Sequence, residues 1–278
     1  MSAIVRKYPA LCLLVLAMIL GMAPVLAVNA GLLPTGWAQL GALSAGLAGI
    51  ILAAVEGRKG GVRELLRRIL IWRVGLQWWA YALLFPVVMS VASLTLFDRL
   101  GGPAVDWSGL QPLYTVIPTL IFLIIMAGIG EEYGWRGFAL PRLQARYKAL
   151  HSALVVGVIW AIWHIPMFFT RGTAQFQMRE QAGWALPILG YSLFVIAGSI
   201  QYTWLFNNTR GSVLLAAVAH GAGNAWVGSY IDVYRGNFGG VLTFAALHVL
   251  VSILVVLLAG PANLSRSKAR NALAPEGG

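Results

Sequence analysis

Ionisable side chains gather at the end of one long apolar stretch of this sequence. The stretch that begins at Pro118 stays apolar until Glu131, Glu132 and Arg136 follow in the pattern E-E-x-x-x-R. On a helix, Glu132 and Arg136 lie one turn apart and can pair, whereas Glu131 is rotated by about 100° from Glu132. The pattern therefore predicts one glutamate held by the arginine and a second glutamate free to act as a general base.

Two further apolar stretches carry histidines with a polar or aromatic partner. His164 follows Trp160 by four residues, and Asn224 follows His220 by four residues, so each pair shares one helix face. Pro166 lacks a backbone donor, and we expect it to kink the helix near His164. A free carboxylate, two histidines and an amide on three helices supply a general base, its partner and donors for an oxyanion.

Each of these groups also has a purely structural interpretation. Glu132 and Arg136 can form an ion pair that only joins two parts of the bundle. A single membrane histidine, or Asn224 alone, commonly forms a hydrogen bond between helices. His248 has no acidic or amide neighbour at helical spacing, and we expect it to pack or to form a hydrogen bond. The functional hypothesis depends on the coincidence of all the groups.

The composition is that of an integral membrane protein. Of the 278 residues, 59% are hydrophobic and 10% are charged, and the mean hydropathy is +0.77; an ordinary soluble domain has about 25% charged residues. We identify apolar stretches near the roughly 20 residues that cross a bilayer. They are residues 10–28, 37–55, 74–97, 113–130, 150–169, 184–206, 212–230 and 240–259. The predicted fold is an all-α polytopic membrane bundle of about eight helices.

We expect one integral membrane domain over residues 1–278, because no second domain, linker or internal repeat is present. The first apolar stretch resembles a signal peptide in its flanks, but we expect it to be retained because seven more stretches follow. The single cysteine, Cys12, excludes a disulfide framework and a cysteine metal site within one chain.

The net charge of +11 reflects orientation rather than a nucleic-acid partner. Of the 20 lysines and arginines, 16 fall in the N-terminus, the segments 56–73 and 131–149, Arg210 and the C-terminal tail. This asymmetry follows the positive-inside rule and predicts both termini in the cytoplasm, with the plasma (inner) membrane as the location. The bilayer is a predicted partner, and no nucleic-acid motif is present.

The fourth apolar stretch must be longer than its hydropathy suggests. Glu131 lies roughly 27 Å along its helix from Leu113, and His164 lies roughly 21 Å from the start of its own helix. Because the chemistry needs these side chains together, we expect the fourth helix to continue past Glu131 to about Gly137 or beyond. A cavity between the fourth, fifth and seventh helices should result.

The sequence resembles a known family of intramembrane endopeptidases in three motifs. They are E-E-x-x-x-R, aromatic-x-x-x-H and H-x-x-x-N, in this order and on separate apolar helices. The known family is the CAAX-prenyl-protease and bacteriocin-processing (CPBP, or Abi) family, and the resemblance covers about residues 112–227 as a catalytic core. Trp160 stands where the family pattern more often has phenylalanine, so aromatic character is kept.

The resemblance implies a role for each matching residue. Glu131, together with His164, would activate water for attack on a peptide carbonyl, and His220 and Asn224 would stabilise the resulting oxyanion. Glu132 and Arg136 would act in positioning and in substrate-side electrostatics. The implied partner is a peptide or a lipidated protein in or at the membrane.

A cofactor is not required by this mechanism, although the family is frequently labelled as metalloproteases. Glu131, His164 and His220 could ligate a divalent ion such as zinc. The sequence lacks H-E-x-x-H, in which one helix supplies two histidines and a base. We therefore favour water activation by glutamate and histidine.

Two other functions remain open at this point. Intramembrane glutamates and histidines also serve as relays in proton- or ion-coupled transporters, although the sequence has no pair of interrupted half-helices of the kind that transporters show. The family also includes members linked to bacteriocin self-immunity, so a non-catalytic membrane protein of that type is the second alternative.

Overall fold

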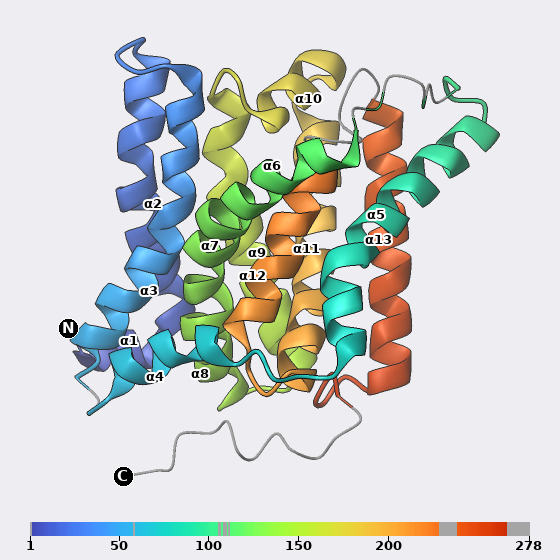
Figure 1. Ribbon diagram of the computed structural model, residues 1–278. Helices are drawn as coiled ribbons and strands as arrows, with labels where there is room; N and C mark the ends of the chain where they lie inside the picture. The colour runs from blue at the N-terminus through green and yellow to red at the C-terminus, as the bar shows by residue number, and fades with distance from the viewer. Residues whose placement is uncertain are drawn as a thin grey trace.

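The described part of the protein is built from helices alone. The computed structural model describes residues 2–57, 59–104, 107, 110, 112–227 and 238–265. Over these ranges the chain forms a helical bundle without a strand (Figure 1). The predicted all-α class is therefore confirmed.

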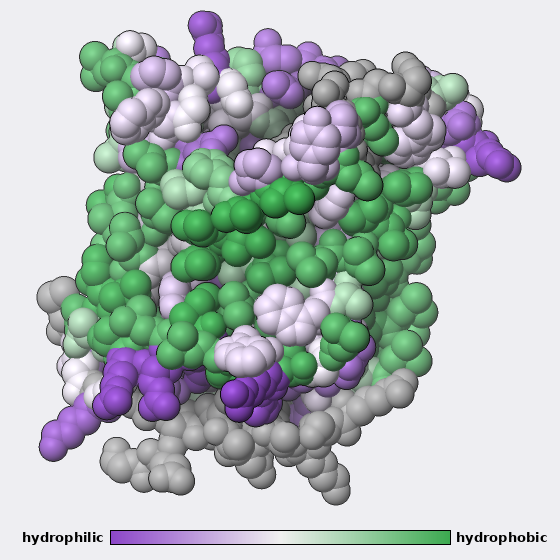
Figure 2. Space-filling model, in the orientation of Figure 1, coloured by the Kyte–Doolittle hydropathy of each residue, from purple (hydrophilic) through white to green (hydrophobic). Residues whose placement is uncertain are grey.

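Within these ranges, seven helices are long and apolar enough to cross a membrane. They are α2 (Pro9–Asn29), η1 with α3 (Thr35–Val55), α5 (Leu76–Arg99), a composite helix (Leu113–Gln144), α9 with η6 (Ala149–Phe169), α11 (Ala185–Asn208) and α13 (Phe238–Ala259). Figure 2 shows the corresponding apolar belt, with hydrophilic residues gathered at its two ends. The protein is an integral membrane protein, as its composition predicts.

The predicted stretch 212–230 contains a shorter helix, α12 (Val213–Ala225), of 13 residues. Ser212 caps its start, because the hydroxyl accepts a hydrogen bond from the backbone N–H of Leu215 at 3.1 Å. Most of its residues are buried, so α12 lies inside the bundle rather than against lipid. The end of the predicted stretch, residues 228–230, lies outside the described residues.

Within the described ranges, three shorter α-helices lie at the two ends of the bundle. They are α1 (Ser2–Lys7), α4 (Gly61–Arg67) and α10 (Ala174–Ala182).

The composite helix is the element that carries the two glutamates. It runs for 32 residues, so the predicted continuation past Glu131 is confirmed. Its parts are η3 (Leu113–Thr115), α6 (Val116–Leu123), the π-helical η4 (Ile124–Ile129), α7 (Gly130–Glu132), the π-helical η5 (Tyr133–Ala139) and α8 (Leu140–Gln144). The glutamates thus lie between two π-helical segments, which are rare and often occur at functional sites.

Glycines allow the composite helix to pack directly against its neighbours' backbones. A Cβ atom added at Gly128 would lie 2.3 Å from the carbonyl oxygen of Ala217 on α12. One added at Gly134 would lie 2.3 Å from the carbonyl oxygen of Ala45 on α3. Only glycine fits at such contacts, so the sequence fixes the position of the glutamates between α3 and α12.

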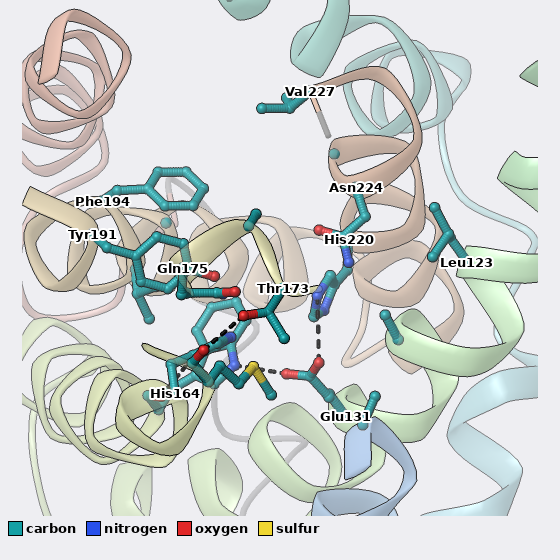
Figure 3. A pocket seen from close by; sticks show the side chains of 18 of the residues that line it. Leu123, Glu131, His164, Thr173, Gln175, Tyr191, Phe194, His220, Asn224 and Val227 are labelled. Carbon is teal, nitrogen blue, oxygen red and sulfur yellow. Dashed lines mark hydrogen bonds and ion pairs between the residues drawn. The ribbon is translucent and has the colours of Figure 1, made fainter. Parts of the chain in front are cut away.

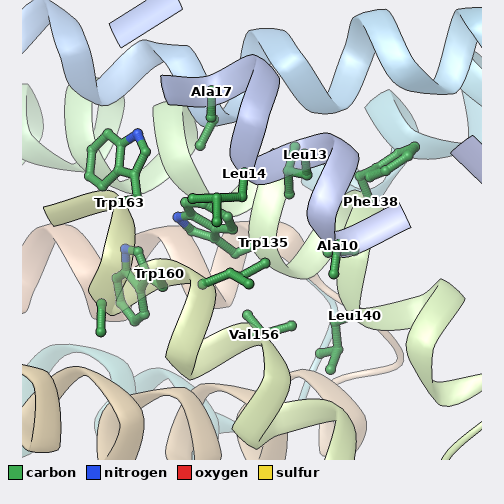
Figure 4. Close-up of a cluster of buried hydrophobic side chains, with 14 of the residues drawn as sticks. Ala10, Leu13, Leu14, Ala17, Trp135, Phe138, Leu140, Val156, Trp160 and Trp163 are labelled. Atoms are coloured by element: carbon green, nitrogen blue, oxygen red, sulfur yellow. The ribbon is translucent and has the colours of Figure 1, made fainter. Parts of the chain in front are cut away.

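A cluster of buried apolar side chains packs around the part of the composite helix that follows the glutamates (Figure 4). Trp135, Phe138 and Leu140 of the composite helix are all 0% exposed. They pack in one cluster with residues of α2 and α9: Ala10, Leu13, Leu14, Ala17, Val156 and Trp163. Because Trp135, Phe138 and Leu140 follow the glutamates along the composite helix and are fully buried, this cluster lies between the glutamates and one end of the bundle.

That end, which we call the basic face, comprises residues 6–7, 56–57, 59–73, 142–149 and 260–265. Arg146 donates to the backbone carbonyl of Lys7 at 2.9 Å, and the N–H of Ala149 donates to the carbonyl of Ala262 at 2.9 Å. Arg142 pairs with Glu56 at 2.5 Å. The segments rich in lysine and arginine therefore lie together.

The opposite end, which we call the distal face, comprises residues 30–39 and 170–183. Gly172 has a φ of +84°, and a Cβ atom added there would lie 2.8 Å from the Cβ atom of Thr35. The connection between α2 and α3 therefore touches the connection between α9 and α10. Figure 1 shows α10 at this end, away from the N-terminus.

Candidate active site

Glu131 is a buried carboxylate that is held by two indoles. It is 4% exposed, and its Oε2 accepts hydrogen bonds from Nε1–H of Trp160 at 2.7 Å and of Trp135 at 3.3 Å. Its Oε1 lies 3.8 Å from Nε2 of His220 (Figure 3). Two donors on one oxygen fix the orientation of the carboxylate, and the other oxygen is turned toward His220.

Glu132 forms the ion pair with Arg136 that its spacing predicts. Its Oε1 lies 3.0 Å from Nη1 of Arg136, and both side chains are 0% exposed. The same Oε1 lies 2.9 Å from Nδ1 of His220. A carboxylate can only accept, so Nδ1–H of His220 donates to Glu132 and its Nε2 faces Glu131.

Arg136 is also enclosed by aromatic rings. Its guanidinium carbon lies 4.5 Å from the ring centroid of Trp160 and 4.8 Å from that of Tyr202, which is cation–π geometry. Within the described residues, no hydrogen-bond partner is present for Nε and Nη2 of Arg136. The same holds for Oε2 of Glu132. Neither side chain lines the cavity described below, so this pair lies behind the groups that do.

His164 is the last residue of α9 (Ala149–His164). Its Nδ1 lies 2.8 Å from the carbonyl oxygen of Trp160. Because a carbonyl only accepts, Nδ1 carries the hydrogen, and Nε2 of the neutral ring is an acceptor. The α-helix changes to the 3₁₀ segment η6 (Ile165–Phe169) directly after His164, which is the irregularity that Pro166 predicts.

His220 and Asn224 project from α12, as their spacing predicts. The ring of His220 packs edge-on against Trp160, with centroids 5.4 Å apart. Asn224 lies one turn further along and is exposed. Figure 3 shows Asn224, His220 and Glu131 succeeding one another along one wall of a cavity.

This cavity has a volume of about 380 Å³. The predicted site residues that line it are Glu131, Trp160, His164, His220 and Asn224. The expected cavity between the composite helix, α9 and α12 is therefore present. It also extends along α5, α11, α13 and η1, whose side chains complete the lining.

Several contacts of the site were not found from the sequence. Trp135 follows Glu131 by four residues, so the helical spacing that predicted the other pairs also contained this one. Tyr202 lies on α11, in a stretch without an ionisable residue, and no local pattern predicts its stacking on Arg136. His248 packs among phenylalanines, 4.4 Å from the ring of Phe244, which agrees with the packing role expected for it.

The described residues show no cluster of metal ligands. Among them, no three His, Cys, Asp or Glu side chains are arranged to hold a metal ion. Oε2 of Glu131 accepts two indole N–H groups, and Nδ1 of His220 faces Glu132. The zinc site considered from the sequence, with Glu131, His164 and His220 as ligands, stays a prediction.

Comparison with known proteins agrees with the motifs. Residues 113–226 match the family described as type II CAAX prenyl endopeptidase Rce1-like. A relative from Methanococcus maripaludis, CAAX prenyl protease 2, is 31% identical over 140 residues, which cover 50% of this chain and 51% of that protein. The match to the relative thus spans about half of its length, and the family match over residues 113–226 includes every residue of the three motifs. Residues 113–226 are therefore similar to the type II CAAX prenyl endopeptidase Rce1-like family, in the part of the chain that carries the three motifs.

Proposed function

We propose that this protein is an intramembrane endopeptidase that hydrolyses peptide bonds of membrane-associated or lipidated polypeptides. The observation that carries the proposal is a fixed carboxylate, Glu131, beside two imidazoles on the wall of one membrane cavity. The family match and the name of the relative, CAAX prenyl protease 2, support the same class of reaction.

Glu131 and His164 act on the attacking water. A water molecule in the cavity donates one hydrogen bond to Oε1 of Glu131 and the other to Nε2 of His164, because both atoms are acceptors on the lining. Glu131 takes a proton from this water as the hydroxide oxygen bonds to the carbonyl carbon. Donors fixed beforehand by Trp135 and Trp160 keep the carboxylate in place during this step.

His220 and Asn224 stabilise the tetrahedral oxyanion. Glu132 holds Nδ1–H of His220, so that protonated Nε2 and the amide of Asn224 present N–H donors to the cavity. When the C–N bond breaks, the proton on Glu131 moves to the leaving amine. One water is consumed, a carboxyl group and an amine are formed, and Glu131 is again ionised.

The positive charge of the basic face supports an orientation with both termini in the cytoplasm. Arg6, Arg63, Arg142, Arg146 and Lys148 belong to segments at this face. We place the protein in the plasma membrane on this basis, because lysine and arginine concentrate on the cytoplasmic side of membrane proteins.

The test is cleavage by purified protein in detergent. The substrate is a fluorescence-quenched peptide that ends in C-a-a-X with an S-farnesylated cysteine, beside its unlipidated counterpart. In ¹⁸O-water, we expect two fragments with one ¹⁸O in the new carboxyl group. We also expect the rate to be unchanged by EDTA. Absence of cleavage, together with an ion flux in liposomes that depends on Glu131, would instead identify a transporter.

A further inference from the structure

The cavity reaches one end of the bundle and not the other. From Glu131 its lining continues to residues of the distal face: Thr35, Gly36, Gln39, Thr170, Gly172, Thr173 and Gln175. Among the described residues, none of the basic face belongs to the lining. The cavity therefore opens at the distal face.

Toward the basic face the site is closed by packed side chains. Trp135, Phe138 and Leu140 are 0% exposed, and so are Leu205 and Leu215 on the neighbouring α11 and α12. Interiors packed in this way leave no passage for a polypeptide. A segment arriving from the basic face would have to separate the helices to reach Glu131.

The mouth of the cavity carries polar groups that suit a peptide chain. Gln175 is 7% exposed and lines the cavity, and its amide makes no hydrogen bond within the residues that the structure describes. Figure 3 shows Gln175 beside Tyr191 and Thr173, on the same side of the cavity as His164. An amide offers one acceptor and two donors, which match the N–H and C=O of a peptide group.

The support for Gln175 is well fixed. Thr173 caps α10, because its hydroxyl accepts the N–H of Phe176 at 3.2 Å. The same hydroxyl lies 2.6 Å from the carbonyl oxygen of Met167 and 2.8 Å from that of Thr170. The start of α10 is thus tied to η6, which directly follows His164, so Gln175 and His164 are held in one arrangement.

We infer that the substrate enters through the distal face, between η1 (Thr35–Ala42) and the loop before α10, past Gln175. The substrate class is a membrane-anchored polypeptide whose scissile bond is presented on the side of the membrane opposite the termini. This inference rests on the proposed function and narrows it. With the termini in the cytoplasm, the substrates are extracytoplasmic segments rather than cytoplasmic C-a-a-X proteins.

Cysteine accessibility tests the entry path without any need for catalysis. In a Cys12→Ala background, Val195→Cys places a thiol on the cavity wall, where Val195 is 2% exposed. Leu205→Cys is the matched control, because Leu205 lies on the same helix, is 0% exposed and is not part of the lining. Lys148→Cys marks the basic face. A membrane-impermeant methanethiosulfonate is added to sealed vesicles of both orientations.

We expect Val195→Cys to react in the vesicle orientation in which Lys148→Cys is protected, and Leu205→Cys to react in neither. Reaction of Val195→Cys from the same side as Lys148→Cys would overturn the inference. Reaction of Val195→Cys in detergent but from neither side of the vesicles would also overturn it, since entry would then be through lipid. Failure of peptide cleavage in detergent would leave this result unaffected.

A kinetic comparison tests the role of Gln175. Gln175→Leu removes the amide at similar size, and we expect the KM for the quenched peptide to rise about tenfold with kcat nearly unchanged. Gln177→Leu, at an exposed position of the same helix, should leave both constants unchanged. An unchanged KM in Gln175→Leu would contradict an entry path along this side chain.

Discussion

Glu131 and Glu132 are adjacent in the sequence, yet they have different partners. The rotation of about 100° between neighbouring helical residues turns them to different sides. Glu132 faces Arg136 and Nδ1 of His220, whereas Glu131 faces two indole N–H groups and the cavity. In the proposed mechanism, this separation allows Glu132 to hold the site together while Glu131 acts on water.

The Glu132–Arg136 pair predicts a large effect on stability. Arg136→Met leaves Glu132 unpaired where both side chains are 0% exposed, and we expect a loss of about 3 kcal/mol. The double variant Glu132→Gln/Arg136→Met removes the unpaired charge and should lose less than the two single variants together. Melting temperatures in detergent provide the measurement, with the exposed Arg67→Met as control. Additive losses would show that the two side chains are not coupled.

Replacement of His220 should lower the peptidase activity while the protein stays folded. His220→Ala removes a donor to the oxyanion, and we expect kcat to fall by roughly 10² to 10³-fold. His151→Ala is the control, since His151 is exposed and its ring contacts only Tyr147 among the aromatic contacts described. Peptide cleavage and elution of the folded protein in detergent are compared. Equal activity in the two variants would remove His220 from the mechanism.

At the scale of elements, the composite helix determines where the carboxylates lie. It passes between α3 and α12 at backbone contacts that only glycine permits. The distance between Glu131 and His220 therefore depends on these contacts, because the two residues belong to the two helices that meet there.

Gly128→Ala tests this dependence. The added methyl group would lie 2.3 Å from the carbonyl oxygen of Ala217, and overpacking of this kind costs about 1–3 kcal/mol. We expect the composite helix to move away from α12, with a lower melting temperature and a fall in kcat larger than any change in KM. In the control Gly198→Ala, the nearest side-chain atom is 4.0 Å away, so stability should be kept. Normal kcat in Gly128→Ala would contradict the account.

Sequence patterns predicted the helices and the motif pairs because both depend on local spacing. The helical period predicted that Arg136 pairs with Glu132 and that Asn224 lies on the same helix face as His220. Hydropathy located the long membrane-spanning helices. The contact of Glu132 with His220 joins residues 88 positions apart. It is set by the register of the composite helix against α12, and no local period encodes that register. The sequence did not predict the proposed role of Gln175 at the cavity mouth for a similar reason. That role depends on how α10 packs against the cavity.

At the scale of the whole molecule, the cavity lining that the described residues form reaches the distal face and not the basic face. The end that the lining does not reach carries the basic segments, and the cavity mouth lies at the distal face. In the proposed mechanism, Glu131 and the two histidines lie on the path that begins at the distal face, and we propose that the charge of the basic face orients that path across the membrane.

Orientation gives a direct prediction. Single cysteines that replace Lys7 and Lys148 should react with an impermeant thiol reagent only in inside-out plasma-membrane vesicles, because both residues are exposed on the basic face. A cysteine at Gln181, exposed on the distal face, should react only in right-side-out vesicles. The reverse pattern would place the termini outside.

The most direct test is the Glu131→Gln variant, measured as kcat for the quenched peptide with purified protein. Glutamine keeps the size of the side chain, and its amide oxygen can still accept from Trp135 and Trp160, but it cannot take a proton from water. We predict an unchanged melting temperature and a fall in kcat of at least about 10²-fold. The control Glu64→Gln, whose side chain is 62% exposed, should cleave at the normal rate. Cleavage by Glu131→Gln at that same rate would contradict the assignment of Glu131 as the base.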